Sequence, residues 1–301
     1  MSERDVRVYE VGPRDGLQNE AASIPTEAKL RFIDLLGDAG LREIEATSFV
    51  SPRAIPQLAD ADALLAGLDR RAGVRYPVLV PNARGLERAE AAGADALCVF
   101  TAASDPFTRA NINMSIADSI DAFRPVVARA RERGWWTRGY VSTAFGCPYQ
   151  GEVGEAAVVG VAQELIAVGV DELSIGDTIG VAGPTDVRRV VDALIGSGIG
   201  PDRLAMHFHD TRGTALANVV TALELGIRCF DASTGGTGGC PYAPGAAGNL
   251  ATEDLVYLLD REGMAHGVDL EALLVAARHI AETLGRPLST KVGQAGAWRV
   301  P

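Results

Sequence analysis

Short apolar runs rich in valine and isoleucine alternate along the chain with longer stretches in which apolar residues recur at helical spacing. The short runs predict β-strands, and the longer stretches predict amphipathic helices. The predicted strands are Val6–Val11, Glu43–Ala46, Tyr76–Val80, Ala96–Thr101, Thr137–Ser142, Glu172–Gly176, Ala205–His209 and Arg228–Ala232. The predicted helices are Thr26–Ala39, Asp60–Leu68, Ala83–Ala92, Ser119–Arg133, Gly154–Val168, Thr185–Ile195, Thr214–Leu225 and Thr252–Glu262.

Strict alternation of eight strand–helix units predicts an α/β fold, the closed parallel (β/α)₈ or TIM barrel. The alternative is an open doubly wound sheet, whose first turn would normally carry a Gly-rich dinucleotide fingerprint. Here the first turn reads Gly12-Pro13-Arg14-Asp15-Gly16, which favours the barrel. We expect residues 1–262 to form the catalytic barrel. Residues 263–301, with one helix over Leu270–Leu284, are predicted to be a C-terminal helical extension packed on it, too short for a core of its own.

Composition narrows the classes of partner. The chain has 301 residues and 47% hydrophobic content, enough for one large core. The 28 Lys and Arg residues against 39 Asp and Glu residues argue against binding to nucleic acid or to an anionic membrane, because both require a basic surface. We expect no secretory signal and no membrane span, since no apolar run has the required length. Four scattered cysteines without a Cys-x-x-Cys pair are typical of reduced thiols in a cytoplasmic protein.

The carboxyl ends of the strands are where a parallel barrel carries its active site. The polar residues predicted to lie there are Arg14 and Asp15 after the first strand, Glu45 in the second, Asp177 after the sixth, His207 and His209 in the seventh, and Asn249 after a loop that carries Cys240. A closed barrel would bring the first, seventh and eighth strands together. We therefore expect these side chains to share one rim.

The residue types at this rim predict a divalent metal site. His207 and His209 are two positions apart on a strand, so their side chains point to one face. Either they share a cation or they are hydrogen-bonded histidines of the barrel interior. With Asp15 and Asn249 they would offer two imidazoles, a carboxylate and an amide oxygen, a set that suits Mg²⁺ or Mn²⁺. The alternatives are a solvated turn for Asp15 and a helix N-cap for Asn249.

Arg14 is a permanent planar cation next to a predicted metal ligand. It either forms a surface ion pair with Glu45 or holds a carbonyl oxygen that becomes an enolate, where a fixed charge is most useful. Glu45 would orient Arg14 or accept a proton. The pair Asp177-Thr178 is either a hydrogen-bonded pair of the barrel interior or a substrate contact.

The cysteines divide into two groups. Cys240 lies in a Gly-rich loop after the last strand; such a loop is a flexible surface, a phosphate cradle or a mobile segment that delivers a thiol as a proton donor. Cys147 competes for that role, since its Gly-Cys-Pro-Tyr motif repeats the one around Cys240. Cys98 and Cys229 lie within apolar strands and are predicted to be core residues.

Several of these motifs resemble the hydroxymethylglutaryl-CoA lyase family. They are Val11-Gly12-Pro13-Arg14-Asp15-Gly16-Leu17-Gln18-Asn19-Glu20, Thr47-Ser48-Phe49-Val50-Ser51-Pro52, Gly176-Asp177-Thr178-Ile179-Gly180, Gly239-Cys240-Pro241-Tyr242-Ala243 and Gly248-Asn249-Leu250-Ala251-Thr252-Glu253-Asp254-Leu255-Val256-Tyr257. Arg-Asp and His-x-His alone indicate only the wider superfamily of metal-dependent Claisen-type barrels. The Gly-Cys-Pro-Tyr loop narrows the resemblance to the lyases, from about Val6 to Ala295.

The resemblance implies cleavage of 3-hydroxy-3-methylglutaryl-CoA to acetyl-CoA and acetoacetate, a step of leucine degradation. It implies that Asp15, His207, His209 and Asn249 bind the metal, that Arg14 stabilises the enolate and that Cys240 transfers a proton, with Glu45 and Asp177 at further active-site positions. The expected partners are an acyl-CoA thioester and further copies of the chain, in a homodimer or higher homo-oligomer.

Two residues differ from the pattern of the family and leave the identity of the substrate's acyl group open. Arg212 and Thr214 stand where the animal enzymes carry Tyr and Gln. A related 3-hydroxy-3-substituted glutaryl-CoA is therefore an alternative substrate. A Claisen-type synthase is a second alternative, although such chains usually carry further C-terminal segments. A metal-binding scaffold without activity is the third, but it would give Arg14 no reason to lie beside the metal.

Overall fold

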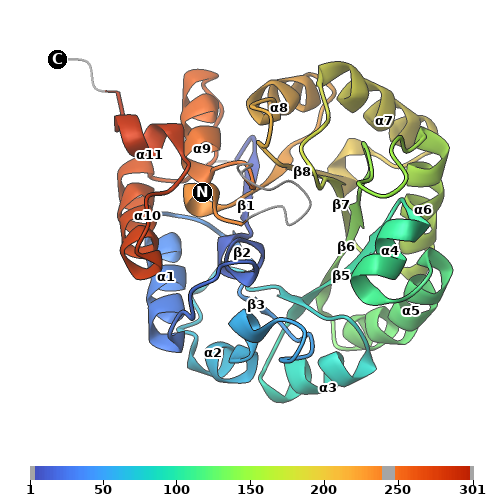
Figure 1. Ribbon diagram of the computed structural model, residues 1–301, viewed down its shortest axis with the longest axis horizontal. Coiled ribbons are helices and arrows are strands. Elements are labelled where there is room, and N and C mark those ends of the chain that lie inside the picture. The colour runs from blue at the N-terminus through green and yellow to red at the C-terminus, as the bar shows by residue number, and fades with distance from the viewer. Residues whose placement is uncertain (1–3, 239–247, 299–301) are drawn as a thin grey trace.

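Nine parallel strands form one sheet that curls around a central axis in the computed structural model, which describes residues 4–238 and 248–298 (Figure 1). Their order is β2-β1-β9-β8-β7-β6-β5-β4-β3. The strands are β1 (Arg7–Glu10), β2 (Glu43–Ile44), β3 (Thr47–Ser48), β4 (Val78–Leu79), β5 (Ala96–Ala102), β6 (Trp136–Ser142), β7 (Glu172–Asp177), β8 (Leu204–Phe208) and β9 (Cys229–Ala232).

The second strand of the barrel consists of two short pieces, β2 and β3, which pair with different neighbours and so close the barrel. β2 pairs with β1, whereas β3 pairs with β4. Between them the backbone N–H of Glu45 donates to Glu10 on one side (2.9 Å), and that of Ala46 donates to Pro77 on the other (3.0 Å). The prediction of one strand over Glu43–Ala46 was therefore wrong in detail, because the segment changes partner within it. The predicted (β/α)₈ barrel is confirmed.

A ring of helices covers the outside of the strands (Figure 1). The helices are α1 (Thr26–Asp38), α2 (Ala61–Gly67), α3 (Ala83–Ala91), α4 (Asp105–Ile112), α5 (Ile116–Glu132), α6 (Glu155–Val168), α7 (Pro184–Gly196), α8 (Ala215–Glu224), α9 (Thr252–Arg261), α10 (Leu270–Leu284) and α11 (Lys291–Ala295). The sequence pattern did not predict α4, whose N-cap is Ser104, or the five-residue α11. Both are too short to show a sustained helical period.

Two apolar layers stabilise this arrangement. The main core lies between the strands and the surrounding helices, and a smaller cluster around Tyr9 and Tyr140 fills the barrel interior. Cys98 and Cys229 belong to the interior cluster and are at most 1% exposed, so their predicted place in the core is confirmed.

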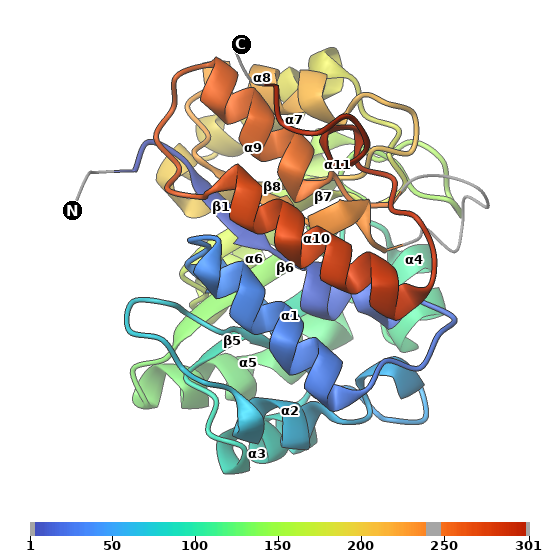
Figure 2. The same cartoon turned by 90° about the vertical axis from the view of Figure 1, so that its left-hand side faces the viewer.

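The C-terminal helices lie against the barrel's outer ring. α10 packs on α1 and α9, and α11 packs on α9 (Figure 2). The boundary at residue 262 stays a prediction. Among the described residues, no helix is both long enough and apolar enough to cross a membrane.

Candidate active site

Three of the predicted metal ligands come together at the carboxyl ends of the strands. One ligand atom from each of Asp15, His207 and His209 lies within 4.8 Å of the others. The two imidazole ring centroids are 5.2 Å apart. His209 lies one residue beyond β8, where its backbone bridges to Asn249, so the predicted fourth ligand is also held at this place.

Asp15 and Arg14 lie on a short helical turn that follows β1. Residues Gly12–Gly16 form one π-helical turn, a local expansion that is frequent at functional sites. The turn packs closely on the segment after β9, because a Cβ atom at Gly16 would be 2.4 Å from Oγ1 of Thr237. A residue with a side chain would therefore displace the turn and move Asp15 away from the histidines.

Asn249 provides the evidence that a cation fits here. Its Nδ2 donates to Oδ2 of Asp15 (2.8 Å) and to the carbonyl of Thr237 (3.1 Å). Its Oδ1 is buried and has no hydrogen-bond partner among the described residues. An unpaired buried acceptor costs free energy, so it calls for a further partner. A divalent ion bound by the three neighbouring ligands fits this donor set.

The protonation states also suit metal binding. Burial and the neighbouring His207 lower the pKa of His209 to about 3, so its imidazole is neutral at physiological pH. Burial alone would raise the pKa of Asp15, but the Arg14 guanidinium and the two histidines hold that pKa below its ordinary value. Neutral imidazole and ionised carboxylate are the forms that bind metals.

Arg14 is held in a buried frame. Its Nε and Nη2 donate to the two carboxylate oxygens of Glu45 (2.8 and 3.3 Å), and its Nη1 donates to Oδ1 of Asp15 (2.6 Å). Arg14 is 6% exposed and Glu45 is 0% exposed, so the alternative of a surface ion pair is wrong. The hydroxyl of Tyr140 donates to Glu45, and the guanidinium lies 5.3 Å from the Tyr140 ring centroid. This frame orients Arg14 from three sides.

Asp177 organises the loop after β7. Its two carboxylate oxygens accept hydrogen bonds from the backbone N–H groups of Val181 and Ala182 (2.9 and 3.0 Å). Burial raises its pKa to about 6. The neighbouring Thr178 accepts from the backbone of Thr143 instead (2.8 Å), so the two side chains have separate partners.

The two family departures contact the same loop. Nη1 of Arg212 donates to the carbonyls of Ile179 and Gly180, both at 2.8 Å. Thr214 donates from Oγ1 to the carbonyl of Ala182 (2.9 Å). Arg212 and Thr214 therefore stabilise the loop after β7 through its backbone.

Of the two candidate cysteines, only Cys147 lies within the described residues. Cys240 lies outside the described residues, within 239–247. Cys147 is 3% exposed, and its sulfur lies 2.9 Å from the Ser104 hydroxyl. The described part of the last loop ends at Gly238, whose φ is +97° and where a Cβ would be 2.7 Å from Nδ2 of Asn249. A glycine is therefore needed where this loop passes the candidate metal ligands.

Sequence reasoning missed Tyr140 and Asp231, which contact Glu45 and His207 respectively. The available signal was a charged residue on the inward face of an apolar strand: in Cys229–Ala232, Asp231 shares a face with the core residue Cys229.

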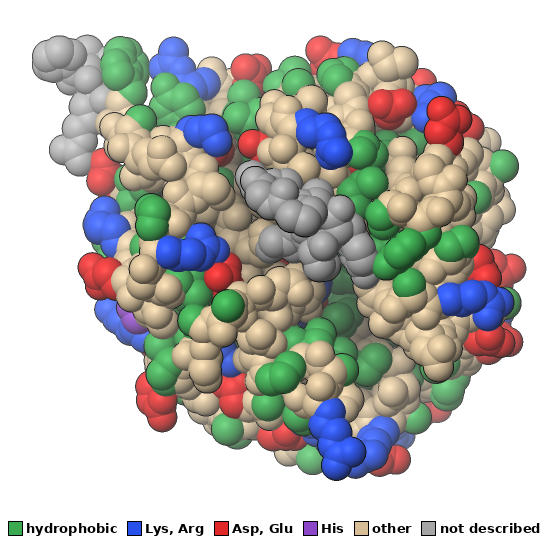
Figure 3. Space-filling model, in the orientation of Figure 1, with side chains coloured by type: hydrophobic (Ala, Val, Ile, Leu, Met, Phe, Trp, Pro, Cys, Tyr) green, Lys and Arg blue, Asp and Glu red, His purple; other side chains and the backbone are tan. Residues whose placement is uncertain are grey.

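Figure 3 shows the face of the molecule that is seen in Figure 1. Most charged side chains lie around the periphery of this face, whereas uncharged and hydrophobic atoms border the depression near its centre.

The fold and the site together define a (β/α)₈-barrel enzyme with a candidate divalent-metal site. A family model described as HMGL-like matches residues 5–280. The chain belongs to this family, and the resemblance drawn from the motifs is confirmed. The mitochondrial hydroxymethylglutaryl-CoA lyase of Rattus norvegicus is 50% identical over 290 residues, which cover 96% of this chain and 89% of the rat protein.

Solved structures agree with this assignment. The crystal structure of the HMG-CoA lyase of Bacillus subtilis is 49% identical, with a TM-score of 0.95, and the match covers 97% of this chain and 98% of that one. An HMG-CoA lyase of Acinetobacter baumannii, solved in complex with coenzyme A and 3-methylmalate, is 39% identical with a TM-score of 0.92 and 98% coverage of both chains.

Proposed function

We propose that this protein cleaves 3-hydroxy-3-methylglutaryl-CoA to acetyl-CoA and acetoacetate. One observation carries the proposal: Arg14, held by Glu45, lies next to Asp15, His207 and His209. A fixed cation beside a metal site is what the cleavage requires, because negative charge moves from an alkoxide oxygen to a thioester enolate.

We propose that Asp15, His207, His209 and Asn249 hold Mg²⁺ or Mn²⁺. The ion, when bound, supplies Lewis acidity that lowers the pKa of the substrate's tertiary hydroxyl. Asp15 is ionised in this arrangement, and we propose that it receives the hydroxyl proton. The bond between C2 and C3 then breaks, its electron pair passes to the thioester as an enolate, and acetoacetate is formed.

Arg14 is proposed to stabilise that enolate. Of the five N–H donors of a guanidinium, three are directed to Glu45 and Asp15. The remaining two lie on adjacent nitrogens and are suited to an oxyanion. Because the guanidinium is buried and oriented before the reaction, it stabilises the developing charge without reorganisation.

Cys240 is proposed to donate the proton that converts the enolate carbon to the methyl group of acetyl-CoA. Its sequence position supports this role, since it follows the segment in which Thr237 and Gly238 contact the site. Glu45 is proposed to orient Arg14, and Asp177 is proposed to shape the substrate side of the rim through the loop after β7.

The test is incubation of the protein with 3-hydroxy-3-methylglutaryl-CoA and Mg²⁺, followed by mass spectrometry of the thioesters. Metal-dependent appearance of acetyl-CoA and acetoacetate is the expected result. The same assay with longer or differently branched 3-hydroxy-3-substituted glutaryl-CoA esters measures the substrate range. Turnover of only those esters, or only condensation of acetyl-CoA with a keto acid, would overturn the proposed reaction.

A further inference from the structure

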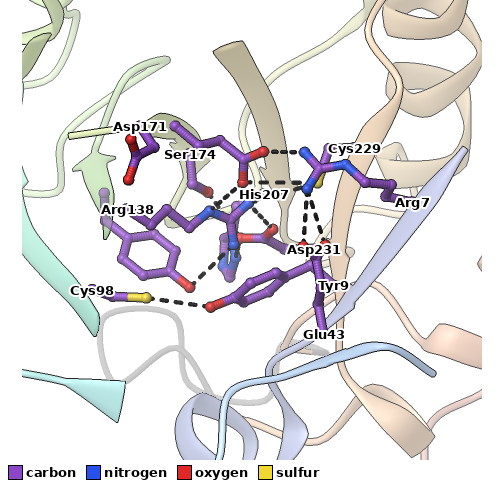
Figure 4. A network of polar contacts seen from close by, with 12 residues as sticks. Arg7, Tyr9, Glu43, Cys98, Arg138, Asp171, Ser174, His207, Cys229 and Asp231 are labelled. Atoms are coloured by element: carbon purple, nitrogen blue, oxygen red, sulfur yellow. Dashed lines mark hydrogen bonds and ion pairs between the residues drawn. The ribbon is translucent and has the colours of Figure 1, made fainter. Parts of the chain in front are cut away.

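A chain of charged side chains runs through the barrel interior from its amino-terminal end toward the candidate metal site (Figure 4). It begins at Arg7, the first residue of β1, which forms ion pairs with Glu43 (3.0 Å) and with Glu172. Those two carboxylates lie on the first residues of β2 and β7. The chain therefore starts at the end of the barrel opposite the site.

Arg138 on β6 continues the chain. It is 0% exposed, its Nε lies 3.1 Å from Oε1 of Glu172, and its Nη2 lies 2.6 Å from Oδ1 of Asp231. Its guanidinium also lies 3.9 Å from the ring centroid of Tyr9. Arg138 thus forms ion pairs with two carboxylates, and of these two only Asp231 accepts a hydrogen bond from it.

Asp231 on β9 is the last link before the site. While Oδ1 pairs with Arg138, Oδ2 accepts a hydrogen bond from the hydroxyl of Ser174 (2.8 Å) and lies 3.2 Å from Nδ1 of His207. The Asp231 side chain is 0% exposed. Because Arg138, Ser174 and His207 contact the two oxygens, they hold the carboxylate in one orientation.

We propose that Asp231 is a positioning residue for His207. It accepts the hydrogen bond from Nδ1–H, which selects the tautomer with an unprotonated Nε2 and directs that nitrogen toward Asp15 and His209. This proposal rests on the proposed metal site. Histidines that bind metals generally donate their other ring N–H to a carboxylate or carbonyl, and loss of such a partner typically lowers metal affinity 10- to 100-fold.

The two histidines differ in this respect. Nδ1 of His209 is buried without a hydrogen-bond partner among the described residues, whereas Nδ1 of His207 has the buried carboxylate of Asp231. His207 is therefore the ligand whose ring is oriented before the ion arrives. A purely structural role for Asp231 would need only its ion pair with Arg138, and Glu172 forms a second ion pair with the same guanidinium.

The two carboxylates that pair with Arg138 supply a matched pair of variants. Asp231→Asn and Glu172→Gln both convert a buried carboxylate paired with Arg138 into an amide, but only Asp231 contacts His207. An asparagine Nδ2 would donate to Nδ1 and select the opposite tautomer, with the proton on Nε2. We expect the Kd for Mn²⁺, titrated into the full chain and followed by electron paramagnetic resonance, to rise about 10- to 100-fold in Asp231→Asn. It should stay within about threefold of the parent in Glu172→Gln, while both variants lose thermal stability.

Two results would overturn the positioning role: a folded Asp231→Asn variant that binds Mn²⁺ as tightly as the parent, or equal losses of affinity in both variants. A parent protein that binds no Mn²⁺ would instead overturn the metal site on which the inference rests. If Asp231→Asn does not fold, nitrogen-15 spectra of the histidine rings in the Mg²⁺-loaded parent decide. A proton on Nδ1 of His207 supports the inference, and a proton on Nε2 refutes it.

Discussion

Replacement of Arg14 by lysine tests the enolate-stabilising role most directly. The change keeps one positive charge but removes the planar fork that reaches both oxygens of Glu45 and one oxygen of Asp15. An ammonium has three N–H donors on a single atom, so it cannot hold both carboxylates and still present an adjacent pair of donors to the substrate.

The structure sets the size of the expected effect. An exposed ion pair contributes less than about 1 kcal/mol. If Arg14 and Glu45 formed only such a pair, Arg14→Lys would lower kcat less than tenfold. Both side chains are buried, however, and the guanidinium lies beside the candidate metal ligands. Loss of one preorganised donor to an oxyanion costs on the order of 10²–10³ in kcat, about 2.7–4 kcal/mol. We therefore expect a decrease of this size in kcat, with a smaller change in KM.

The assay measures kcat and KM for 3-hydroxy-3-methylglutaryl-CoA at saturating Mg²⁺, with Mn²⁺ affinity and thermal stability measured in parallel. Arg70→Lys is the matched control, since Arg70 forms an exposed pair with Asp95 (3.1 Å) away from the site and should leave kcat unchanged. A kcat of Arg14→Lys within tenfold of the parent, with metal binding intact, would refute the reasoning. The metal would then have to stabilise the enolate alone.

Three further predictions follow from the site and its surroundings. His209→Ala should abolish metal-dependent cleavage and weaken Mn²⁺ binding while the barrel stays folded by circular dichroism; normal activity and metal affinity would show that the site is wrongly placed. Cys240→Ser should slow turnover strongly, because a hydroxyl is a far poorer acid than a thiol, and Cys147→Ser should have a milder effect; the reverse order would transfer the proton donor to the loop after β6. Burial raises the pKa of Glu253 to about 8 from an ordinary 4.5, so its contribution to stability is fully present below pH 4.5 and is lost as the pH rises through 8. In Glu253→Gln the side-chain carbonyl can still accept the hydrogen bond from Gly235. Between pH 5 and pH 9 the free energy of unfolding, measured with denaturant, should therefore fall by up to about 4 kcal/mol less in this variant than in the parent. The same pH profile in both proteins would contradict the buried charge.

Local patterning was sufficient for the barrel and for most of its elements. Period-two and helical spacing of apolar residues predicted α10 at Leu270–Leu284 and most other helices within a residue or two at each end. These patterns are local, because strands and helices must each present an apolar face to one shared core. The second strand was the exception, since a change of partner between β1 and β4 leaves no mark in the residues of 43–48 themselves.

The candidate site was predicted in the same way, but only as a set of residue types at strand ends. The rule that parallel strands share one catalytic rim placed Asp15 with His207 and His209, and the structure brings these three together. The same reasoning included Asn249, whose contact with Asp15 joins residues 234 positions apart.

The tertiary structure alone decided which groups are buried and which pairs face one another. Arg14 and Glu45 could equally have formed a surface pair, and only the packed barrel shows that both are enclosed and supported by Tyr140. Asp231 was expected only as part of a strand. Its contacts with Arg138 and His207 come from the fixed stagger of strands around a closed barrel, and hydrogen bonds between such distant residues depend on that three-dimensional register, which the local sequence does not encode.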